Sequence, residues 1–162
     1  MKSAEIAKTQ KMIKRISVVA PVYNEEECIK LFVEKTIKTF KANSLKGEIL
    51  IVNDGSTDKT KEILEGMAKK DSLVRVINNR KNLGLTGAAW TGFKNAKEDV
   101  IVFLPSDLES NPEEDIPILL KPLEEGYDFA AGRRDGSRLN LIKSATSAVF
   151  NTLARLMFKV PV

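Results

Sequence analysis

Two apolar stretches of the chain each end in polar groups that can bind a ligand. Residues 48–53 continue into Asp54 and a glycine-bearing turn, and residues 16–22 continue into Tyr23 and Glu25. Both stretches have the composition of buried parallel strands. In open α/β sheets ligands bind in the crevice at the carboxyl ends of the strands. The pair therefore predicts a nucleotide pocket, with Asp54 as acceptor for a base N–H and Tyr23 as a flat face.

A third carboxylate follows another apolar stretch, residues 100–104. Asp107 is expected to stand in the same crevice, where it can hold Mg²⁺ or Mn²⁺, because hard cations take oxygen ligands and often keep only one or two carboxylates. Pro105, two residues before Asp107, has no side-chain oxygen with which to bind a metal ion. Glu109, two residues after Asp107, is therefore the natural second oxygen ligand. The alternative for either residue is an ordinary loop acid. For Asp54 and Glu25 the alternatives are a turn with a helix cap and a solvated helix start.

The elements that must position these residues alternate along the chain. Apolar runs and segments of helical period predict an α/β fold, with an open, mostly parallel sheet and helices on both faces. Pro117 and Pro122 make the last helix doubtful as one straight piece, and Trp90 is expected in the core. Strands are predicted at residues 15–22, 48–53, 74–78, 100–104 and 127–132, and helices at residues 25–41, 58–70, 85–96 and 111–125.

Composition excludes several classes of enzyme. The chain has 162 residues, no histidine and one cysteine. A Ser-His-Asp triad, a Cys-His pair, a zinc site with histidine and an internal disulfide are therefore excluded. The chemistry must use carboxylates, hydroxyls, lysine and arginine. A reducing, cytoplasmic compartment is expected, since Cys28 has no partner for a disulfide.

The charge is distributed unevenly and suggests three segments. Residues 1–15 form a basic N-terminal extension, residues 16–138 the α/β domain with the predicted nucleotide pocket, and residues 139–162 an amphipathic helix that the chain leaves incomplete, as in a C-terminally truncated fragment. No acidic residue follows Asp135. This cationic, apolar tail predicts contact with the cytoplasmic face of a membrane, although no run is long enough to span one.

The motifs around these residues resemble those of inverting family-two glycosyltransferases, which have the nucleotide-sugar-binding glycosyltransferase A-type fold. The matching segments include residues 21–25, 52–58, 82–84 and 106–109. The resemblance implies that Pro21, Tyr23, Glu25 and Asp54 bind the nucleotide, and that Asp107 belongs to the acidic metal motif and is catalytic. The sequence departs from the family at Pro105, which stands where the motif usually has its first aspartate.

A further set of residues is similar to the branch that makes polyprenyl-phosphate sugars, the dolichyl-phosphate mannose or glucose synthase type. Gly132, Arg133 and Arg134 are followed by Arg138 and then by Ser147. The resemblance implies that Arg133, Arg134, Arg138 and Ser147 hold the phosphate of the acceptor, with Arg134 catalytic. Guanidinium groups suit phosphate oxygens, and a solvated basic loop is the alternative.

The acceptor decides the mechanism. A lipid monophosphate is already an anion near neutral pH and needs no general base, whereas a sugar hydroxyl needs one. We therefore expect a polyprenyl phosphate to attack the anomeric carbon of a UDP- or GDP-sugar in line, with inversion. The alternatives are transfer to a saccharide hydroxyl and an inactive nucleotide-sugar-binding module. A dinucleotide-binding domain is disfavoured, since no G-x-G-x-x-G motif follows the first strand.

Overall fold

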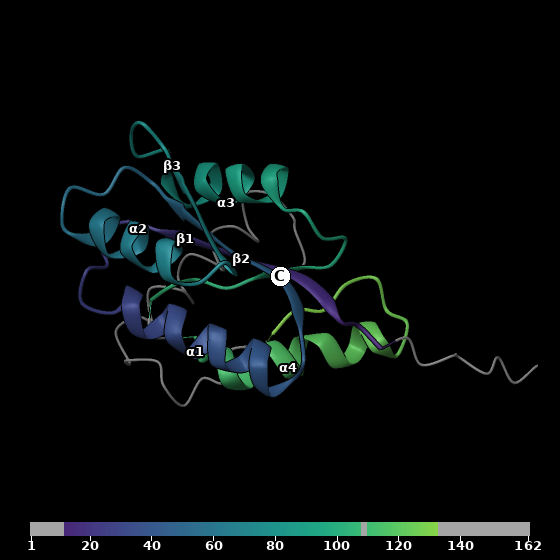
Figure 1. Cartoon of the computed structure of the whole chain (residues 1–162). Coiled ribbons are helices and arrows are strands. Elements are labelled where there is room, and N and C mark those ends of the chain that lie inside the picture. The colour runs from purple at the N-terminus through teal and green to yellow at the C-terminus, as the bar shows by residue number, and fades with distance from the viewer. Residues whose placement is uncertain (1–11, 108–109, 133–162) are drawn as a thin grey trace, which may run out of the picture. The chain divides into compact units, whose positions relative to one another are not determined.

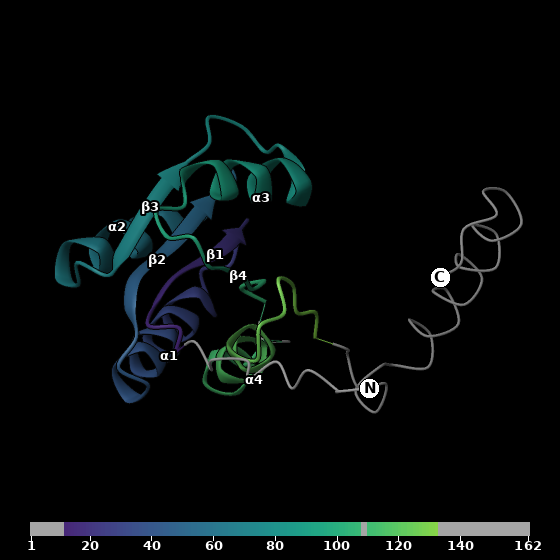
Figure 2. The same cartoon turned by 90° about the vertical axis from the view of Figure 1, so that its right-hand side faces the viewer.

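Four parallel strands form the sheet of this computed structural model, which describes residues 12–107 and 110–132. The strands are β1 (Arg15–Val22), β2 (Lys46–Asn53), β3 (Val74–Asn78) and β4 (Ile101–Phe103), in the order β3-β2-β1-β4. Figure 2 shows them side by side in this order. All described residues except Gly132 lie in one compact unit, Met1–Ala131. The predicted α/β class with a parallel sheet is confirmed.

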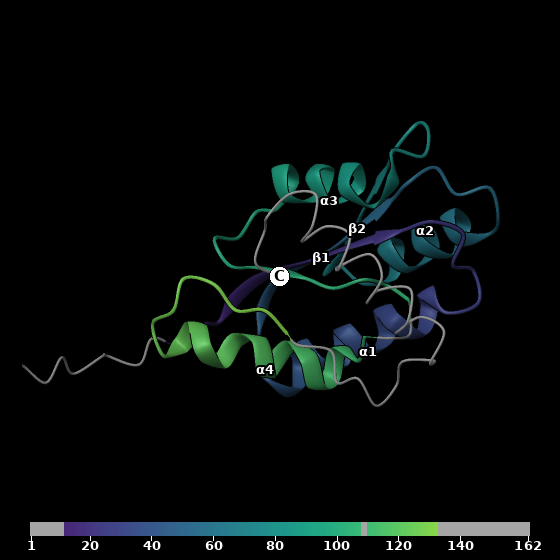
Figure 3. The same ribbon diagram turned by 180° about the vertical axis from the view of Figure 1, so that it is seen from behind.

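Helices cover both faces of this sheet. They are α1 (Ile29–Ala42), α2 (Thr60–Lys70), α3 (Gly84–Asn95) and α4 (Pro112–Glu124). Helix α1 packs against α2 and α4, and α3 packs against β1 and β2 from the opposite face (Figures 1 and 3). Strands β2 and β3 follow β1 on one side of it, and β4 lies on the other side. The point at which a crevice is expected in a doubly wound sheet therefore lies between β1 and β4.

The central strands are apolar on both sides because helices bury both faces. Every residue of β1 after Arg15 is buried, and so are the last six residues of β2. On the α1 side, Phe32 and Phe40 fill the space between helix and sheet and are each 1% exposed. On the α3 side a Cβ at Gly92 would lie 2.3 Å from Val19 Cγ1, so glycine lets this helix approach β1 closely.

Two expectations about the later elements are wrong. Residues 127–132 form no strand, and the side chains of Tyr127 and Phe129 are 59% and 81% exposed, so these residues have strand-like composition without a buried face. Helix α4 is one continuous helix despite Pro117 and Pro122. Its Ile116 and Leu120 are buried in the core, and this packing sustains the helix across the missing backbone donors. It begins at Pro112 after Asn111, as predicted.

Candidate functional site

The loops that follow β1 and β2 are joined by reciprocal hydrogen bonds. Asn24 N–H donates to Ser56 Oγ over 3.0 Å, and Thr57 N–H donates to Asn24 Oδ1 over 2.8 Å. Asn24 adopts a left-handed backbone conformation, with φ of 54°, which asparagine tolerates better than most residues. The loop that carries Tyr23 and Glu25 is therefore fixed against the loop that follows Asp54.

A second pair of hydrogen bonds between the same two loops uses the carboxylates of Glu26 and Asp58. Glu26 N–H donates to Asp58 Oδ2 over 3.2 Å, and Lys59 N–H donates to Glu26 Oε2 over 2.8 Å. Asp58 Oδ1 also accepts from Thr60 N–H, so Asp58 satisfies a backbone donor at the first residue of α2. Helix α1 consequently begins at Ile29 rather than at residue 25, since the preceding residues bond to the neighbouring loop.

Asp54 lies directly after β2 and holds the loop between β3 and α3. Its Oδ1 accepts from Asn79 Nδ2 over 2.7 Å, and Leu83 N–H lies 3.0 Å from both carboxylate oxygens. The residue is 3% exposed. A carboxylate has about four acceptor positions, so these contacts leave capacity on Oδ2 for one further donor.

Gly55 allows this loop to come close. It has φ of 74°, and a Cβ there would lie 2.8 Å from Lys81 C and 2.9 Å from Asn82 N. Any other residue would push the β3–α3 loop away from Asp54. The loop brings two exposed cations, Arg80 and Lys81, to this edge of the sheet.

The loop after β4 is attached to the loop after β1 through Ser106 and Cys28. Ser106 Oγ–H donates to the carbonyl oxygen of Pro21 over 3.0 Å. The Cys28 thiol lies 2.8 Å from Glu25 Oε2, to which it donates, and 3.8 Å from the carbonyl oxygen of Ser106. Burial, the hydrogen bond to Glu25 and the nearby charges of Glu25 and Asp107 raise the pKa of Cys28 to about 12. The thiol therefore remains a protonated donor between two carboxylates.

These contacts place the predicted nucleotide residues at one edge. Pro21 is buried and serves through its carbonyl group, Tyr23 is 44% exposed, and Glu25 is half-buried beside Cys28. Asp107 is half-buried in the loop that follows β4. Glu109, Arg133, Arg134, Arg138 and Ser147 lie outside the described residues, as does the predicted tail helix.

Within the described ranges, no group of three or more histidine, cysteine, aspartate or glutamate side chains could hold a metal ion. Two-carboxylate coordination, the arrangement predicted for Asp107 and Glu109, does not need such a group, because Mg²⁺ completes its shell with water and phosphate oxygens. Asp107, the described member of that pair, supplies a carboxylate oxygen of the kind that a hard cation binds.

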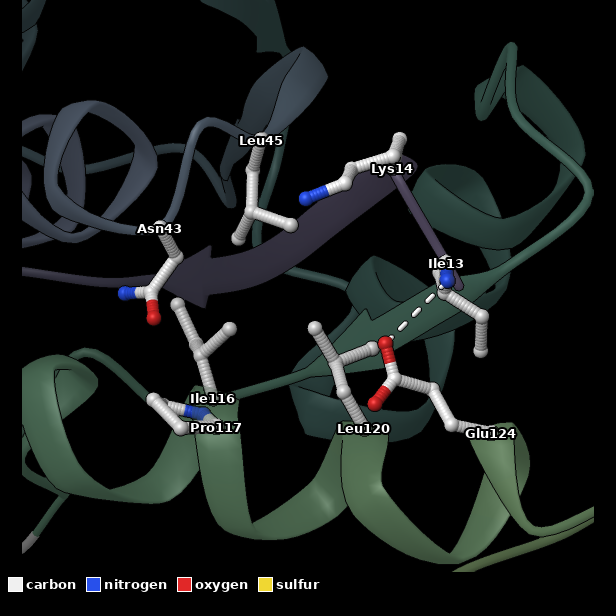
Figure 4. Close-up of a pocket in the computed structure, with 8 residues that line it drawn as sticks. All are labelled: Ile13, Lys14, Asn43, Leu45, Ile116, Pro117, Leu120 and Glu124. Atoms are coloured by element: carbon white, nitrogen blue, oxygen red, sulfur yellow. Dashed lines mark hydrogen bonds between the residues drawn. The ribbon is translucent and has the colours of Figure 1, made fainter. Parts of the chain in front are cut away.

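A separate cavity of about 190 Å³ lies at the opposite end of the sheet. Figure 4 shows Ile116 and Leu120 of α4 facing the start of β1, with Glu124 Oε1 accepting from Ile13 N–H over 3.1 Å. The other residues that line the cavity are Lys14, Asn43, Leu45 and Pro117. The amino ends of the strands meet here, so this cavity is not the crevice expected for a ligand in a doubly wound sheet.

Sequence reasoning missed the part that the third strand plays in the site. Asn79 and the backbone of Leu83 are the direct partners of Asp54. The signal was available, since residues 74–78 also form a strand whose carboxyl end reaches the same edge and continues into polar residues. Asn24 was likewise overlooked, although it is the residue whose side chain joins two loops.

The sequence profile of glycosyl transferase family 2 matches residues 17–153. The chain belongs to this family. The match includes most of β1, all of β2 and the loop after β4 that carries Asp107. The glycosyltransferase A-type fold follows from the same comparison and from similar solved structures. Glucosyl-3-phosphoglycerate synthase from Mycobacterium tuberculosis, solved with phosphoglyceric acid, covers 90% of this chain with a TM-score of 0.63 and 25% sequence identity, and 51% of that chain is matched.

A mannosyltransferase from Pyrobaculum calidifontis, solved with GDP-Man and Mn²⁺, has the same fold. It covers 65% of this chain, with a TM-score of 0.53 and 23% identity, and 31% of that chain is matched. Among the described residues, no helix has the length and apolar character required to cross a membrane.

Relatives named undecaprenyl-phosphate 4-deoxy-4-formamido-L-arabinose transferase are similar over most of the chain. The protein of Photorhabdus laumondii is 38% identical over 143 residues, which is 87% of this chain and 43% of the relative. That of Proteus mirabilis is 37% identical over 146 residues, which is 90% of this chain and 44% of the relative. The chain thus spans less than half the length of these relatives.

Proposed function

We propose that this chain is the nucleotide-sugar-binding part of an inverting glycosyltransferase that transfers a sugar from a UDP- or GDP-sugar to a polyprenyl phosphate. The observation that carries the proposal is the meeting of four predicted ligand residues at the carboxyl edge of one sheet. Tyr23, Glu25, Asp54 and Asp107 follow three different strands, and hydrogen bonds between their loops hold them there. Because these groups are already held in place, little conformational entropy is lost when a ligand binds to them.

In this arrangement each residue has a distinct part. Tyr23, exposed after β1, offers its ring to the base, and Glu25 offers a carboxylate to ribose hydroxyls. Asp54 accepts an N–H of the base on the oxygen that has spare capacity, while its other bonds keep the β3–α3 loop in place. Buried Pro21 contributes through its backbone carbonyl, and exposed Asn24 contributes through its side chain, which holds the two loops together.

The metal is part of the proposal as well. Asp107, with Glu109, would hold Mg²⁺ or Mn²⁺, and the ion would stabilise the negative charge of the leaving diphosphate. The family membership and the position of Asp107 after β4 support this role. The exposed Arg80 and Lys81 beside Gly55 add positive charge at the same edge, which favours an anionic ligand.

The acceptor is proposed from the relatives, whose names specify undecaprenyl phosphate. A phosphate nucleophile fits a chain without histidine, because it needs cations for positioning rather than a base for deprotonation. Arg133, Arg134 and Arg138 with Ser147 are proposed to bind it, with Arg134 next to the reacting phosphate. A location at the cytoplasmic face of a membrane follows from a lipid acceptor and a soluble donor.

Calorimetric titration tests the donor half of the proposal. UDP- and GDP-sugars are titrated into the chain with Mn²⁺ and with EDTA. We expect one nucleotide to bind more tightly than the other, and binding to weaken in EDTA. Binding that is the same in EDTA would support an inactive binding module, and no binding of either donor would contradict the proposal. Transfer of radiolabelled sugar to polyprenyl phosphate, compared with transfer to a free saccharide, then tests the acceptor half.

A further inference from the structure

Helix α3 presents several large apolar side chains to solvent. Its sheet-facing residues, Ala88 and Gly92, are buried, while Leu85 and Trp90 are 63% and 60% exposed. Phe93 is 39% exposed, and its ring packs edge-to-face against Phe103 of β4. Leu83, immediately before the helix, is 48% exposed. We call the surface formed by Leu83, Leu85, Trp90, Phe93 and Lys94 the α3 outer surface. In Figures 1 and 3 no other described helix or strand lies over the outer side of α3.

The expectation that Trp90 lies in the core is therefore wrong. The helix packs through small residues, since Gly92 allows close approach to Val19, and this leaves the larger side chains on the outside. An exposed tryptophan beside other large apolar residues is costly in water and indicates an interaction surface.

The chain segment that contains this surface carries charge of one sign. Between Asp71 and Glu98 the chain contains no carboxylate, but it contains five cations. Arg75 is bonded to Glu48, and Arg80, Lys81, Lys94 and Lys97 are exposed. Lys94 Nζ lies 4.9 Å from the centre of the Trp90 ring, so cation and aromatic face form one unit.

We propose that the α3 outer surface binds the surface of an anionic lipid bilayer. Tryptophan, leucine and phenylalanine with flanking lysine and arginine form the pattern of segments that lie in the headgroup region, where the ring enters the interface and the cations meet lipid phosphates. A protein partner would require complementary carboxylates and a shaped apolar face, whereas a bilayer needs only this combination of charge and apolar area.

The α3 outer surface lies next to the candidate site. Leu83 N–H is bonded to Asp54 in the candidate site, while the Leu83 side chain is about half exposed at the start of the α3 outer surface. A bilayer in contact with this surface would bring lipid phosphates to the edge of the sheet at which the donor is proposed to bind. The inference rests on the proposed function for this purpose, but lipid binding itself can be measured without donor or acceptor.

Trp90 provides a direct test because it is the only tryptophan of the chain. Its fluorescence is recorded with vesicles of phosphatidylglycerol and phosphatidylcholine, with vesicles of phosphatidylcholine alone, and with brominated lipids. We expect a blue shift and quenching by bromine with the anionic vesicles, both reduced by salt. Emission that stays unchanged while the protein sediments with vesicles would assign binding to another segment and overturn the proposal. A blue shift that depends on protein concentration without lipid would indicate a second copy instead and would also overturn it.

Variants separate this surface from the basic tail. Lys94→Glu with Lys97→Glu should weaken binding to anionic vesicles by at least about tenfold, and Trp90→Ala should weaken it comparably. The controls are Lys69→Glu with Lys70→Glu on α2, and Ile118→Ala on α4, an equally exposed apolar side chain. The tail variant Lys143→Glu with Arg155→Glu is measured alongside them. If the controls weaken binding as much as the α3 variants, the effect is one of net charge and the proposal fails. Nucleotide affinity should be retained in all the variants, so a failure of donor binding is recognised separately.

Discussion

The Cys28 thiol donates a hydrogen bond to Glu25 Oε2 over 2.8 Å, so the residue at the start of α1 orients a carboxylate of the candidate site. Cys28 also lies 3.8 Å from the carbonyl oxygen of Ser106, in the loop that carries Asp107. The one cysteine of the chain thus connects the loop after β1 with the loop after β4. From the sequence, Cys28 could be described only as a cysteine without a disulfide partner.

The first prediction concerns the reactivity of this thiol. Its pKa is raised to about 12 by burial and by the carboxylates of Glu25 and Asp107, so at about pH 8 its thiolate fraction should be roughly three orders of magnitude below that of a free cysteine. We expect slow alkylation by iodoacetamide, at a rate that still rises with pH beyond the range in which free thiols level off. The same chain unfolded in urea should react at the ordinary rate. A rate that levels off near the ordinary thiol pKa in the folded protein would show that Glu25 and Cys28 do not interact as described.

The second prediction separates two roles of Asp54. Asp54→Ala removes the acceptor of Asn79 and of Leu83 N–H, and it also removes the proposed acceptor of the base. We expect a loss of roughly 1 to 3 kcal/mol in nucleotide binding, because a buried donor loses its partner. Asn79→Ala is the matched control, since it disturbs the same loop but leaves the carboxylate in place.

Calorimetry with UDP and GDP and urea unfolding are measured for both variants. If Asp54 binds the base, Asp54→Ala should lose much more affinity than Asn79→Ala, although both lower the free energy of unfolding. Equal losses of affinity would show that Asp54 acts only by holding the β3–α3 loop.

The third prediction concerns the metal. Asp107→Asn should abolish the part of nucleotide-sugar affinity that depends on Mn²⁺, and Glu109→Gln should reduce it, because these carboxylates are proposed as the only protein ligands. Asp99→Asn, at an exposed position before β4, is the control and should behave as wild type. Titrations in Mn²⁺ and in EDTA decide the matter. The role assigned to Asp107 is wrong if wild type binds equally well in both.

The strands and helices that position the site could be predicted because their periodicity is strong. Residues 49–52 are uniformly apolar, as expected for a strand with two covered faces, and they lie in β2, which ends at Asn53. Residues 127–132 have similar apolar content, yet they form no strand. Composition alone does not show whether a short apolar run has a neighbouring strand and a face to bury. The exposure of Phe129 is a property of the tertiary arrangement.

The site was predicted in part for a similar reason. Asp54 and Asp107 were recognisable because each is an acid in the loop that follows an apolar strand. The partners that hold them come from distant positions in the sequence, as Asn79 does for Asp54, and no local pattern marks such a pair. Glu26 is a second example. Its place among the acidic residues 25–27 is typical of a helix start, but its carboxylate accepts from Lys59 N–H in another loop. Trp90 was misplaced because its helix packs through glycine and alanine, which a hydrophobicity pattern underweights.

The last prediction concerns the network that fastens the other end of α3 to the sheet. Glu48 is 6% exposed and accepts from Ser17 Oγ, from Lys97 N–H and from Arg75 Nε, at distances of 2.7 to 2.9 Å. Burial works to raise the pKa of this carboxyl group, but the bonds from Arg75, Lys97 and Ser17 outweigh burial and lower it. A lowered folded-state pKa means that ionised Glu48 stabilises the fold above the pKa of the unfolded state, about 4.3. This stabilisation is lost as the pH falls through the folded-state value.

Glu48→Gln should therefore lower the free energy of unfolding at neutral pH by about 1 to 3 kcal/mol, the range for hydrogen bonds to a charged group. The difference from wild type should stay constant down to the ordinary glutamate range and shrink below it, because both proteins then carry a neutral side chain. Glu98→Gln is the control, since Glu98 pairs with an Arg15 side chain that is 62% exposed, and solvent screens such a pair. Urea unfolding of the three proteins across the acidic range measures this directly. A difference between Glu48→Gln and wild type that grows as the pH falls would mean that Glu48 is protonated in the folded protein, and that its contacts with Arg75 and Lys97 are not those of a carboxylate.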